Sequence, residues 1–311
     1  MILALNLNAS LDKIYTVDKL AYGGVVRAQA VDNTAGGKGM HIANICHILQ
    51  EDCVVTGFLG GRTGEYIADR LDERQMKHDF VKIAGETRSC INIATADGCQ
   101  TEVLEKGPAI SQQEIQNFLA KYDKLLDSAD IIAACGSLPV NVPLDFYGTL
   151  AQMAKAKGKK FLLDTSGETL RQTLPYKPFM IKPNKDEIES LTGRKIQSIS
   201  DAAEEVKKFI AMGIEMPIVS LGKEGSVIGC EGSIYHAVPP RYKAVNAVGS
   251  GDSFVAGIAI GLQRKYPIAD VIKLGSACGT ANVLEKESGW VSPDKVDEIF
   301  KAVQIEKLQY R

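Results

Sequence analysis

A short stretch around position 250 combines small flexible residues, an acid and an apolar helical pattern. Gly249, Ser250 and Gly251 come directly before Asp252, and "SFVAGIAIGL" follows with the composition of a buried helix. The first amides of a helix lack partners and carry partial positive charge, so glycines before them let a phosphate reach the backbone. An aspartate beside such a cradle can take a proton from a hydroxyl that attacks the phosphate. The alternative role of Asp252 is that of a helix N-cap.

A second glycine cluster lies early in the chain and also precedes a helical pattern. Residues 34–39 read "TAGGKG", and the following run "MHIANICHIL" has apolar residues on one face. The backbone at Gly37 and the positive charge of Lys38 together favour an anion. Gly39 stands where a Walker P-loop needs Ser or Thr, and neither cluster has the glycine spacing of a dinucleotide-binding fingerprint. The two clusters therefore predict a phosphate-handling site of another type.

The elements that must position these clusters predict an α/β fold. Short apolar runs alternate with amphipathic helical patterns, which favours a mostly parallel central sheet flanked by helices on both faces. The expected strands include 53–60, 129–135, 160–164, 179–182 and 216–221, and the expected helices include 38–49, 64–75, 112–126, 144–157, 201–212, 251–264, 268–286 and 294–304. Ligands of such sheets bind beyond the carboxyl ends of the strands.

Composition argues against several classes of function. The chain has 311 residues, of which 45% are hydrophobic and 24% charged, and its net charge is −2. No basic excess exists to meet a nucleic-acid backbone, and no apolar run reaches the length of a membrane span. Seven cysteines without a C-x-x-C pair indicate reduced thiols in a cytoplasmic protein, and the four histidines and the cysteines show no zinc-ligand spacing.

Two segments interrupt the alternation of strands and helices. Residues 10–34 have no strong helical period, and residues 89–104 read as two strands around a turn at Asp97-Gly98, which is a strong hairpin signal. We expect 10–34 and 87–104 to form a small β-sheet lid that projects from the main domain. The segments of the main nucleotide- and substrate-binding domain would be 1–9, 35–86 and 105–311. A surface hairpin without a role is the alternative.

The two glycine clusters, in this order, resemble the two signatures of the PfkB family of ribokinase-like carbohydrate kinases. "TAGGKGMHIANICHIL" resembles the N-terminal signature and "NAVGSGDSFVAGI" the C-terminal one, in which Asn246 and Ala247 replace the usual Asp-Thr and Ser250 replaces Ala. The resemblance covers essentially the whole chain. It implies a ribokinase-like α/β fold, with Asp252 as the proton acceptor and the backbone of residues 249–251 as the anion hole.

The same resemblance implies positions for ATP and Mg²⁺. "KPNKDE" begins with Lys182 and resembles the motif that organises Mg²⁺ near the nucleotide phosphates, through Asn184 and Glu187. Magnesium keeps several waters and needs few protein ligands. The nucleotide loop "VSLGKEGS" and the late helix "GTANVLE" would supply further contacts to the ribose, the phosphates and the adenine, namely Ser220, Gly222, Gly225 and Asn282. Without a ligand, these segments would be a capped helix, a hairpin turn and a helix surface.

The acceptor side resembles the branch of the family that acts on phosphorylated sugars. "LNLNASLD" places Asp12 where the resemblance implies contact with sugar hydroxyls, with Ala9 in place of the usual proline. A carboxylate suits a sugar because it accepts hydrogen bonds from two hydroxyls. "CGSLP" resembles the family's "SGSLP", which would put Ser137 near the phosphate, although Cys135 departs from the pattern. Gly37, in the first signature, would also lie against the substrate.

Positive charges on the acceptor side point to a phosphorylated substrate. Arg27, Lys38 and Arg88 would bring three positive charges to one end of the site, and Arg can bind a phosphate through two hydrogen bonds. The period of a strand places Cys90 and Asn92 on the same face as Arg88, where the two would line the sugar pocket. Taken one at a time, each of these basic side chains is more commonly a solvated surface charge.

Together these positions imply a kinase that transfers the γ-phosphate of ATP, with Mg²⁺, to a ketohexose monophosphate. Tagatose 6-phosphate is the expected acceptor. Fructose 1-phosphate is the alternative, because no physical argument from the sequence separates two sugars that differ in phosphate position and one stereocentre. A kinase for an unphosphorylated sugar or nucleoside and a non-catalytic phosphosugar sensor are further alternatives, which the basic residues and the intact Asp252 disfavour. The resemblance also implies that lids can pair between the subunits of a homodimer.

Overall fold

The computed structural model describes residues 1–21 and 23–308, and its largest element is a mostly parallel sheet. Within these residues ten strands follow the order β14-β13-β12-β11-β10-β9-β8-β1-β4-β5. Their bounds are β1 Ile2–Asn6, β4 Cys53–Gly60, β5 Val81–Ile83, β8 Ile131–Cys135, β9 Lys160–Asp164, β10 Met180–Ile181, β11 Met216–Ser220, β12 Ser226–Cys230, β13 Ser233–Val238 and β14 Gln304–Lys307. The strands from β11 to β5 run parallel, as expected, whereas β12, β13 and β14 form an antiparallel edge.

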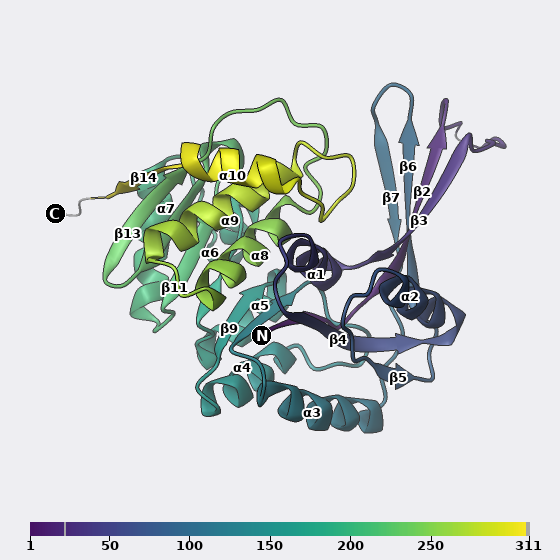
Figure 1. Ribbon diagram of the computed structural model, residues 1–311, viewed down its shortest axis with the longest axis horizontal. Coiled ribbons are helices and arrows are strands. Elements are labelled where there is room, and N and C mark those ends of the chain that lie inside the picture. Colours follow the sequence, from purple (N-terminus) through teal and green to yellow (C-terminus); the bar gives the residue numbers. More distant parts are fainter. Residues whose placement is uncertain (22, 309–311) are drawn as a thin grey trace.

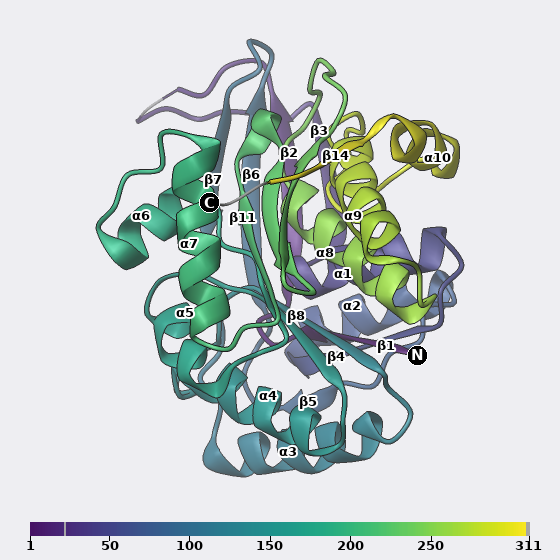
Figure 2. The ribbon, with the colours of Figure 1, turned by 90° about the vertical axis from the view of Figure 1, so that its left-hand side faces the viewer.

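Helices cover both faces of this sheet (Figure 1 and Figure 2). One face carries α1 Lys38–Ile48, α2 Gly61–Glu73, α8 Ser250–Gln263, α9 Ile268–Asn282 and α10 Pro293–Ala302, and the other carries α3 Gln112–Leu126, α4 Phe146–Ala156, α5 Gly167–Thr173, α6 Lys185–Thr192 and α7 Ile199–Ala211. In β1, Ile2 and Ala4 pack into the first core, while Leu3 and Leu5 pack into the second. Burial on both faces explains why the parallel strands read as continuous apolar runs.

A second sheet of four strands projects from the body of the molecule (Figure 1). Its order is β3-β2-β6-β7, with β2 Ser10–Val17, β3 Ala30–Gly36, β6 Arg88–Thr95 and β7 Gln100–Leu104. The expected hairpin is present as β6 and β7, and Gly98 in its turn has φ 85°. This is the small lid sheet. Tyr22 of the expected lid segment and residues 309–311 of the expected main domain lie outside the described residues.

The small sheet starts where strands of the large sheet end. β1 ends at Asn6, and β2 begins at Ser10, so the chain passes from the centre of one sheet directly into the other. The parallel pairing of β2 with β6 places Ser10 beside Arg88 and Asp12 beside Cys90. Side chains of the small sheet are thus carried to the carboxyl ends of the parallel strands, where α/β sheets bind ligands. Among the described helices, none is long and apolar enough to cross a bilayer.

Candidate active site

Asp252 lies in the first turn of α8, but it does not cap the helix. The N-cap is Gly249, which has a left-handed conformation with φ 82°, and no side chain caps the helix start. Asp252 is 4% exposed. The amide of Ser250 donates to Ala247 O over 3.3 Å, whereas the amides of Gly251 and Asp252 have no protein acceptor among the residues that the structure describes. The helix start therefore offers two free donors and a buried carboxylate.

The carboxylate of Asp252 is paired with a histidine. Nδ1 of His41, in the first turn of α1, lies 2.7 Å from Oδ2 of Asp252. Burial lowers the pKa of His41, but the hydrogen bond and charge of Asp252, with the charge of Asp12, outweigh it and raise the pKa above its ordinary value. Sequence reasoning missed His41 because it treated the residue as part of a helical run. The available signal was its position three residues after Lys38 in the first glycine cluster.

A second buried carboxylate, Asp164 at the end of β9, lies between two lysines. Nζ of Lys182 is 3.2 Å from Oδ2 of Asp164, and Nζ of Lys38 is 3.9 Å from the same atom. The charge of Asp164 raises the pKa of Lys38 against the effect of burial, and the charges of Asp252 and Glu187 act in the same direction. Sequence reasoning did not propose Asp164, although an acid at the carboxyl end of a buried strand was a usable signal.

Protein cations balance the charge of Asp164, and Asp252 is hydrogen-bonded to His41. Ligand atoms of Cys135, Asp164 and Asp252 lie within 4.8 Å of one another, a spacing that a metal ion could bridge. However, Asp164 already forms ion pairs with Lys38 and Lys182. Burial raises the pKa of the Cys135 thiol, which keeps the thiol neutral. Lys182 also approaches the turn at residues 249–251, since its Nζ would be 3.2 Å from a Cβ on Gly251. This cluster therefore fits a charge-balanced support for the site better than a metal centre.

Asp12 belongs to the small sheet, and charges of both sheets act on it. Ser10 Oγ donates to its Oδ1 over 2.6 Å. Burial raises the pKa of Asp12, while the hydrogen bond from Ser10 and the positive charges of His41 and Arg88 oppose this rise. A Cβ on Gly36 of the neighbouring strand would lie 2.1 Å from the carboxylate, so glycine there leaves the room that Asp12 occupies. The structure thus brings the predicted sugar-binding acid into the electrostatic range of His41 and Arg88.

Arg88 and Ser137 are linked through Asn8, a buried residue to which sequence reasoning gave no role. Nδ2 of Asn8 donates to Ser137 Oγ and to Lys106 O, each over 3.1 Å. Arg88 donates through Nε and Nη2 to Asn8 O, over 3.2 and 3.0 Å, and through Nη1 to Glu105 O over 2.9 Å. A guanidinium has five N–H donors, so about two remain for a phosphate. The backbone of two segments therefore fixes the guanidinium while leaving part of it free.

The other predicted residues of the acceptor side are less closely connected. Cys90 and Asn92 lie on the same face of β6 as Arg88, and Asn92 Nδ2 donates to Gln100 Oε1 over 3.2 Å. Arg27 is exposed in the connection between β2 and β3. In residues 1–21 and 23–308 it takes part in no hydrogen bond or ion pair that links it to the others. The grouping of Arg27 with Lys38 and Arg88 around a phosphate therefore stays a prediction.

The residues predicted to organise magnesium also begin α6. Asn184 Oδ1 accepts a hydrogen bond from the Glu187 amide over 2.9 Å, and Glu187 Oε2 accepts one from the Asn184 amide over 2.8 Å. This reciprocal pair is a capping box. Oε1 of Glu187 has no protein partner among the described residues, and the charge of this carboxylate raises the pKa of Lys38. The helix cap is present, and the role toward magnesium stays a prediction with one oxygen available for it.

The predicted nucleotide loop connects two antiparallel strands. Ser220 ends β11 and pairs with Asn184 in an isolated parallel bridge, which places the loop beside the start of α6. A 3₁₀ turn at Gly222–Glu224 follows, and Gly225 has φ 87°. A Cβ on Gly225 would lie 1.9 Å from Ala237 O, so the hairpin itself requires glycine there. The hairpin interpretation holds, and the contacts of this loop with a nucleotide stay a prediction.

Asn282 forms hydrogen bonds inside the protein, and the expected contact of this position with the adenine stays a prediction. Its side chain is fully buried. Nδ2 donates to Val248 O over 2.9 Å, and Oδ1 accepts from Ser253 Oγ over 3.0 Å and from the Gly289 amide over 2.8 Å. With both ends of its amide in use, Asn282 ties α9 to the turn that leads into α8. These hydrogen bonds stabilise the turn at residues 248–253.

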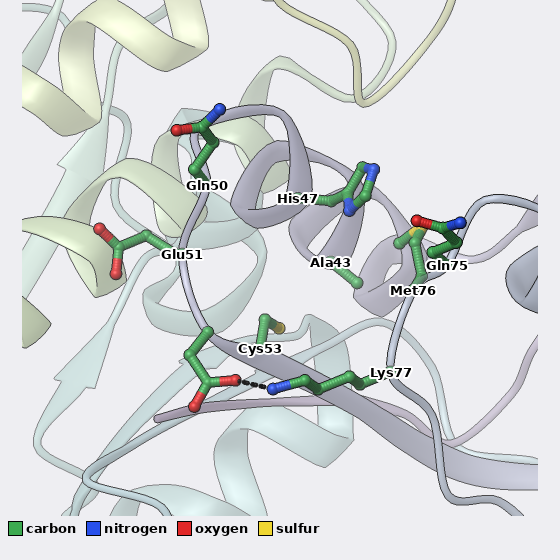
Figure 3. A pocket seen from close by; sticks show the side chains of 9 residues that line it. Ala43, His47, Gln50, Glu51, Cys53, Gln75, Met76 and Lys77 are labelled. Carbon is green, nitrogen blue, oxygen red and sulfur yellow. Dashed lines mark hydrogen bonds and ion pairs between the residues drawn. The ribbon is translucent and has the colours of Figure 1, made fainter.

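The pocket in Figure 3 lies away from these residues, at the C-terminal end of α1. It has a volume of about 320 Å³, and its walls include Gln50–Cys53 and Gln75–Lys77. Nζ of Lys77 pairs with Oδ1 of Asp52 over 2.6 Å on one side (Figure 3). None of the predicted site residues lines this pocket. The candidate active site is therefore identified by its buried charged residues and free helix amides, and not by a detected pocket.

The chain that carries these two helix starts also matches a known protein family. The family described as "pfkB family carbohydrate kinase" matches residues 6–295. The chain belongs to the pfkB family of carbohydrate kinases, and it is therefore a phosphotransferase that uses ATP.

Individual relatives cover nearly the whole chain. The tagatose-6-phosphate kinase of Staphylococcus epidermidis is 40% identical over 308 residues, which are 98% of this chain and 99% of the relative. The tetrameric inhibited form of phosphofructokinase-2 from Escherichia coli has a TM-score of 0.90 and 26% identity, covering 97% of this chain and 98% of that one. Arabidopsis thaliana ribokinase complexed with ribose and ATP has a TM-score of 0.80 and 19% identity, covering 96% and 98%. The fold is thus ribokinase-like, as expected.

Proposed function

We propose that this kinase transfers the γ-phosphate of ATP to tagatose 6-phosphate, with Mg²⁺ as a cofactor, and forms a ketohexose bisphosphate. The observation that carries the proposal is the buried carboxylate of Asp252 beside the free amides of α8. A carboxylate there can accept the proton of an acceptor hydroxyl, while the amides stabilise charge on the transferring phosphoryl group. Gly249, Ser250 and Gly251 supply the turn that lets the phosphate approach.

The acceptor would be held by the two sheets together. Asp12 would accept hydrogen bonds from sugar hydroxyls, and Arg88 and Lys38 would bind the sugar phosphate. The remaining contacts to the sugar would come from Gly37, Cys90, Asn92 and Ser137. The 40% identity to a tagatose-6-phosphate kinase supports this acceptor over fructose 1-phosphate, which stays the alternative.

ATP would lie along the starts of α8 and α6. Oε1 of Glu187 and the nearby Asn184 fit Mg²⁺, which prefers oxygen ligands and can be held through water. When bound, Mg²⁺ would neutralise charge on the nucleotide phosphates. Ser220, Gly222 and Gly225 would contact the nucleotide from the adjacent hairpin, and Lys182 would support the turn at Gly251.

Segments 10–34 and 87–104 would act as a lid over the main domain. Closure would exclude water and bring the exposed Arg27 toward the sugar phosphate. The outer face of the lid sheet carries Val31 and Val103, which are 48% and 55% exposed, and it could pair with a second subunit. A relative is described as tetrameric, which supports such association. Sedimentation of the purified protein as a monomer would contradict the pairing.

A panel of acceptors tests the proposed function. Mg-ATP is incubated with the protein and tagatose 6-phosphate, fructose 1-phosphate, fructose 6-phosphate, unphosphorylated tagatose or no sugar, and ADP formation is followed. We expect the highest kcat/KM with tagatose 6-phosphate and little ADP with unphosphorylated tagatose, because the latter leaves Arg88 and Lys38 without an anion. A higher kcat/KM with fructose 1-phosphate would show that this sugar is the acceptor instead of tagatose 6-phosphate. If no sugar increased the formation of ADP, the proposal as a whole would be contradicted.

A further inference from the structure

His41 is hydrogen-bonded to one of the carboxylates that the proposed reaction uses and is affected by the charge of the other. Its Nδ1 is 2.7 Å from Oδ2 of Asp252 on α8, and the charge of Asp12 on β2 also acts on the imidazole. On another side, a Cβ on Gly289 would lie 2.6 Å from the Cβ of His41, so the turn after α9 packs directly against the residue. Nε2 of His41 has no protein partner in the described part of the chain. The ring is held by its surroundings and keeps one nitrogen free.

The hydrogen bond from His41 can orient the carboxylate of Asp252. In the residues that the structure describes, His41 is the single side-chain hydrogen-bond partner of the Asp252 carboxylate, and the bond uses Oδ2 alone. With its proton on Nδ1, neutral His41 donates to Oδ2 and restrains the rotation of the carboxyl group. Oδ1 is then left for another partner, which a base needs in order to receive a proton.

We propose that His41 is a positioning residue for Asp252, which it holds by one carboxylate oxygen so that the other can accept the proton of the acceptor hydroxyl. This inference rests on the proposed role of Asp252 as the base. It gives His41 no direct part in bond making. The effect on the reaction is transmitted through a single hydrogen bond that joins α1 to α8.

The charges around His41 make this role depend on pH. Asp252 from α8 and Asp12 from β2 favour the imidazolium, whereas burial and Lys38 on α1 oppose it, and the net effect raises the pKa of His41. Arg88 from β6 acts on Asp12 in turn. Below its raised pKa, His41 is a cation paired with Asp252, which weakens the carboxylate as a base. Turnover is therefore expected to fall as the pH decreases through the pKa of His41.

Two substitutions separate the hydrogen bond from the charge. His41→Leu removes the donor, and His41→Asn places an amide N–H near the position of Nδ1 but does not titrate. With Mg-ATP and tagatose 6-phosphate, we expect His41→Leu to lower kcat on the order of 10- to 100-fold, as for loss of a hydrogen bond to a charged group. His41→Asn should rescue part of that loss and keep its rate to lower pH than the wild type. The matched control is His47→Asn, on the same helix but on the wall of the remote pocket.

A second measurement does not depend on activity. In the ligand-free protein, NMR titration of the His41 ring should give a pKa above the ordinary value, and Asp252→Asn should lower it. The role of His41 would be overturned by an unchanged His41 pKa in Asp252→Asn or by full activity of His41→Leu. It would also be overturned if the rate of His41→Asn fell at low pH as it does in the wild type. If Asp252→Asn itself retains activity, the proposed base fails first. If Asp252→Asn is inactive and the His41 variants are not impaired, the present inference alone fails.

Discussion

Asp252→Asn is expected to bind ATP and the phosphosugar and to lose turnover by roughly 10²- to 10⁴-fold. Asn has nearly the size of Asp, and its amide oxygen can still accept the hydrogen bond from His41, so the local structure should persist. An amide cannot take the proton of the acceptor hydroxyl, however. Steady-state kinetics would give kcat, and calorimetry would give the two dissociation constants.

The control for this variant is Asp270→Asn, since Asp270 also lies in the first turn of a helix, α9, but outside the site. It should keep the kcat of the wild type. A kcat of Asp252→Asn within a few-fold of wild type would show that Asp252 is not the base. Loss of ATP binding would instead assign Asp252 to the nucleotide.

Arg88→Ala is expected to raise the KM for the phosphosugar by about 10- to 100-fold and to leave the KM for ATP unchanged, because hydrogen bonds to a charged group are lost. Arg88 also donates to the carbonyls of Asn8 and Glu105, so its removal should loosen the junction between the two sheets as well. Arg88→Lys keeps the positive charge but lacks the planar guanidinium that can form two parallel hydrogen bonds. We therefore expect a smaller rise in the KM for the phosphosugar. Initial rates at varied sugar and ATP concentrations measure both constants.

Arg194→Ala removes an exposed arginine just after α6 and serves as the comparison, with both constants expected to match the wild type. If Arg88→Ala raised the KM for ATP as much as the KM for the sugar, Arg88 would belong to the nucleotide side. If neither constant changed while the thermal midpoint fell, its role would be confined to the hydrogen bonds with the backbone.

Most of the parallel strands and the turn between β11 and β12 could be predicted from the sequence, whereas β5, β13 and β14 could not. Strands β4 and β9 occupy their expected ranges because burial on both faces makes them continuous apolar runs. Strand β14, Gln304–Lys307, is short and largely exposed, so it shows neither an apolar run nor a clear alternation. Helix α5, Gly167–Thr173, is too short to display a helical period.

The same distinction between local and distant information applies to the site. Asp252 and Lys38 could be found because each belongs to a local pattern of glycines before a helix. The pairing of His41 with Asp252 depends on how α1 packs against α8, which no local pattern records. For Asn282, the family resemblance implied a position beside the adenine. It could not show that the side-chain amide forms hydrogen bonds with Val248, Ser253 and Gly289.

The pairing of α1 with α8 joins residues 211 positions apart, and this has a consequence for synthesis of the chain on the ribosome. Ile42, Ile45 and Cys46 of α1 are fully buried in a core to which α8 and α9 contribute. Strands β1, β4 and β8 can cover part of α1 early, but its contact with α8 cannot form until residues 250–263 have emerged, and partly covered chains are prone to aggregate. A product released before α8 would lack both that cover and Asp252, the proposed proton acceptor.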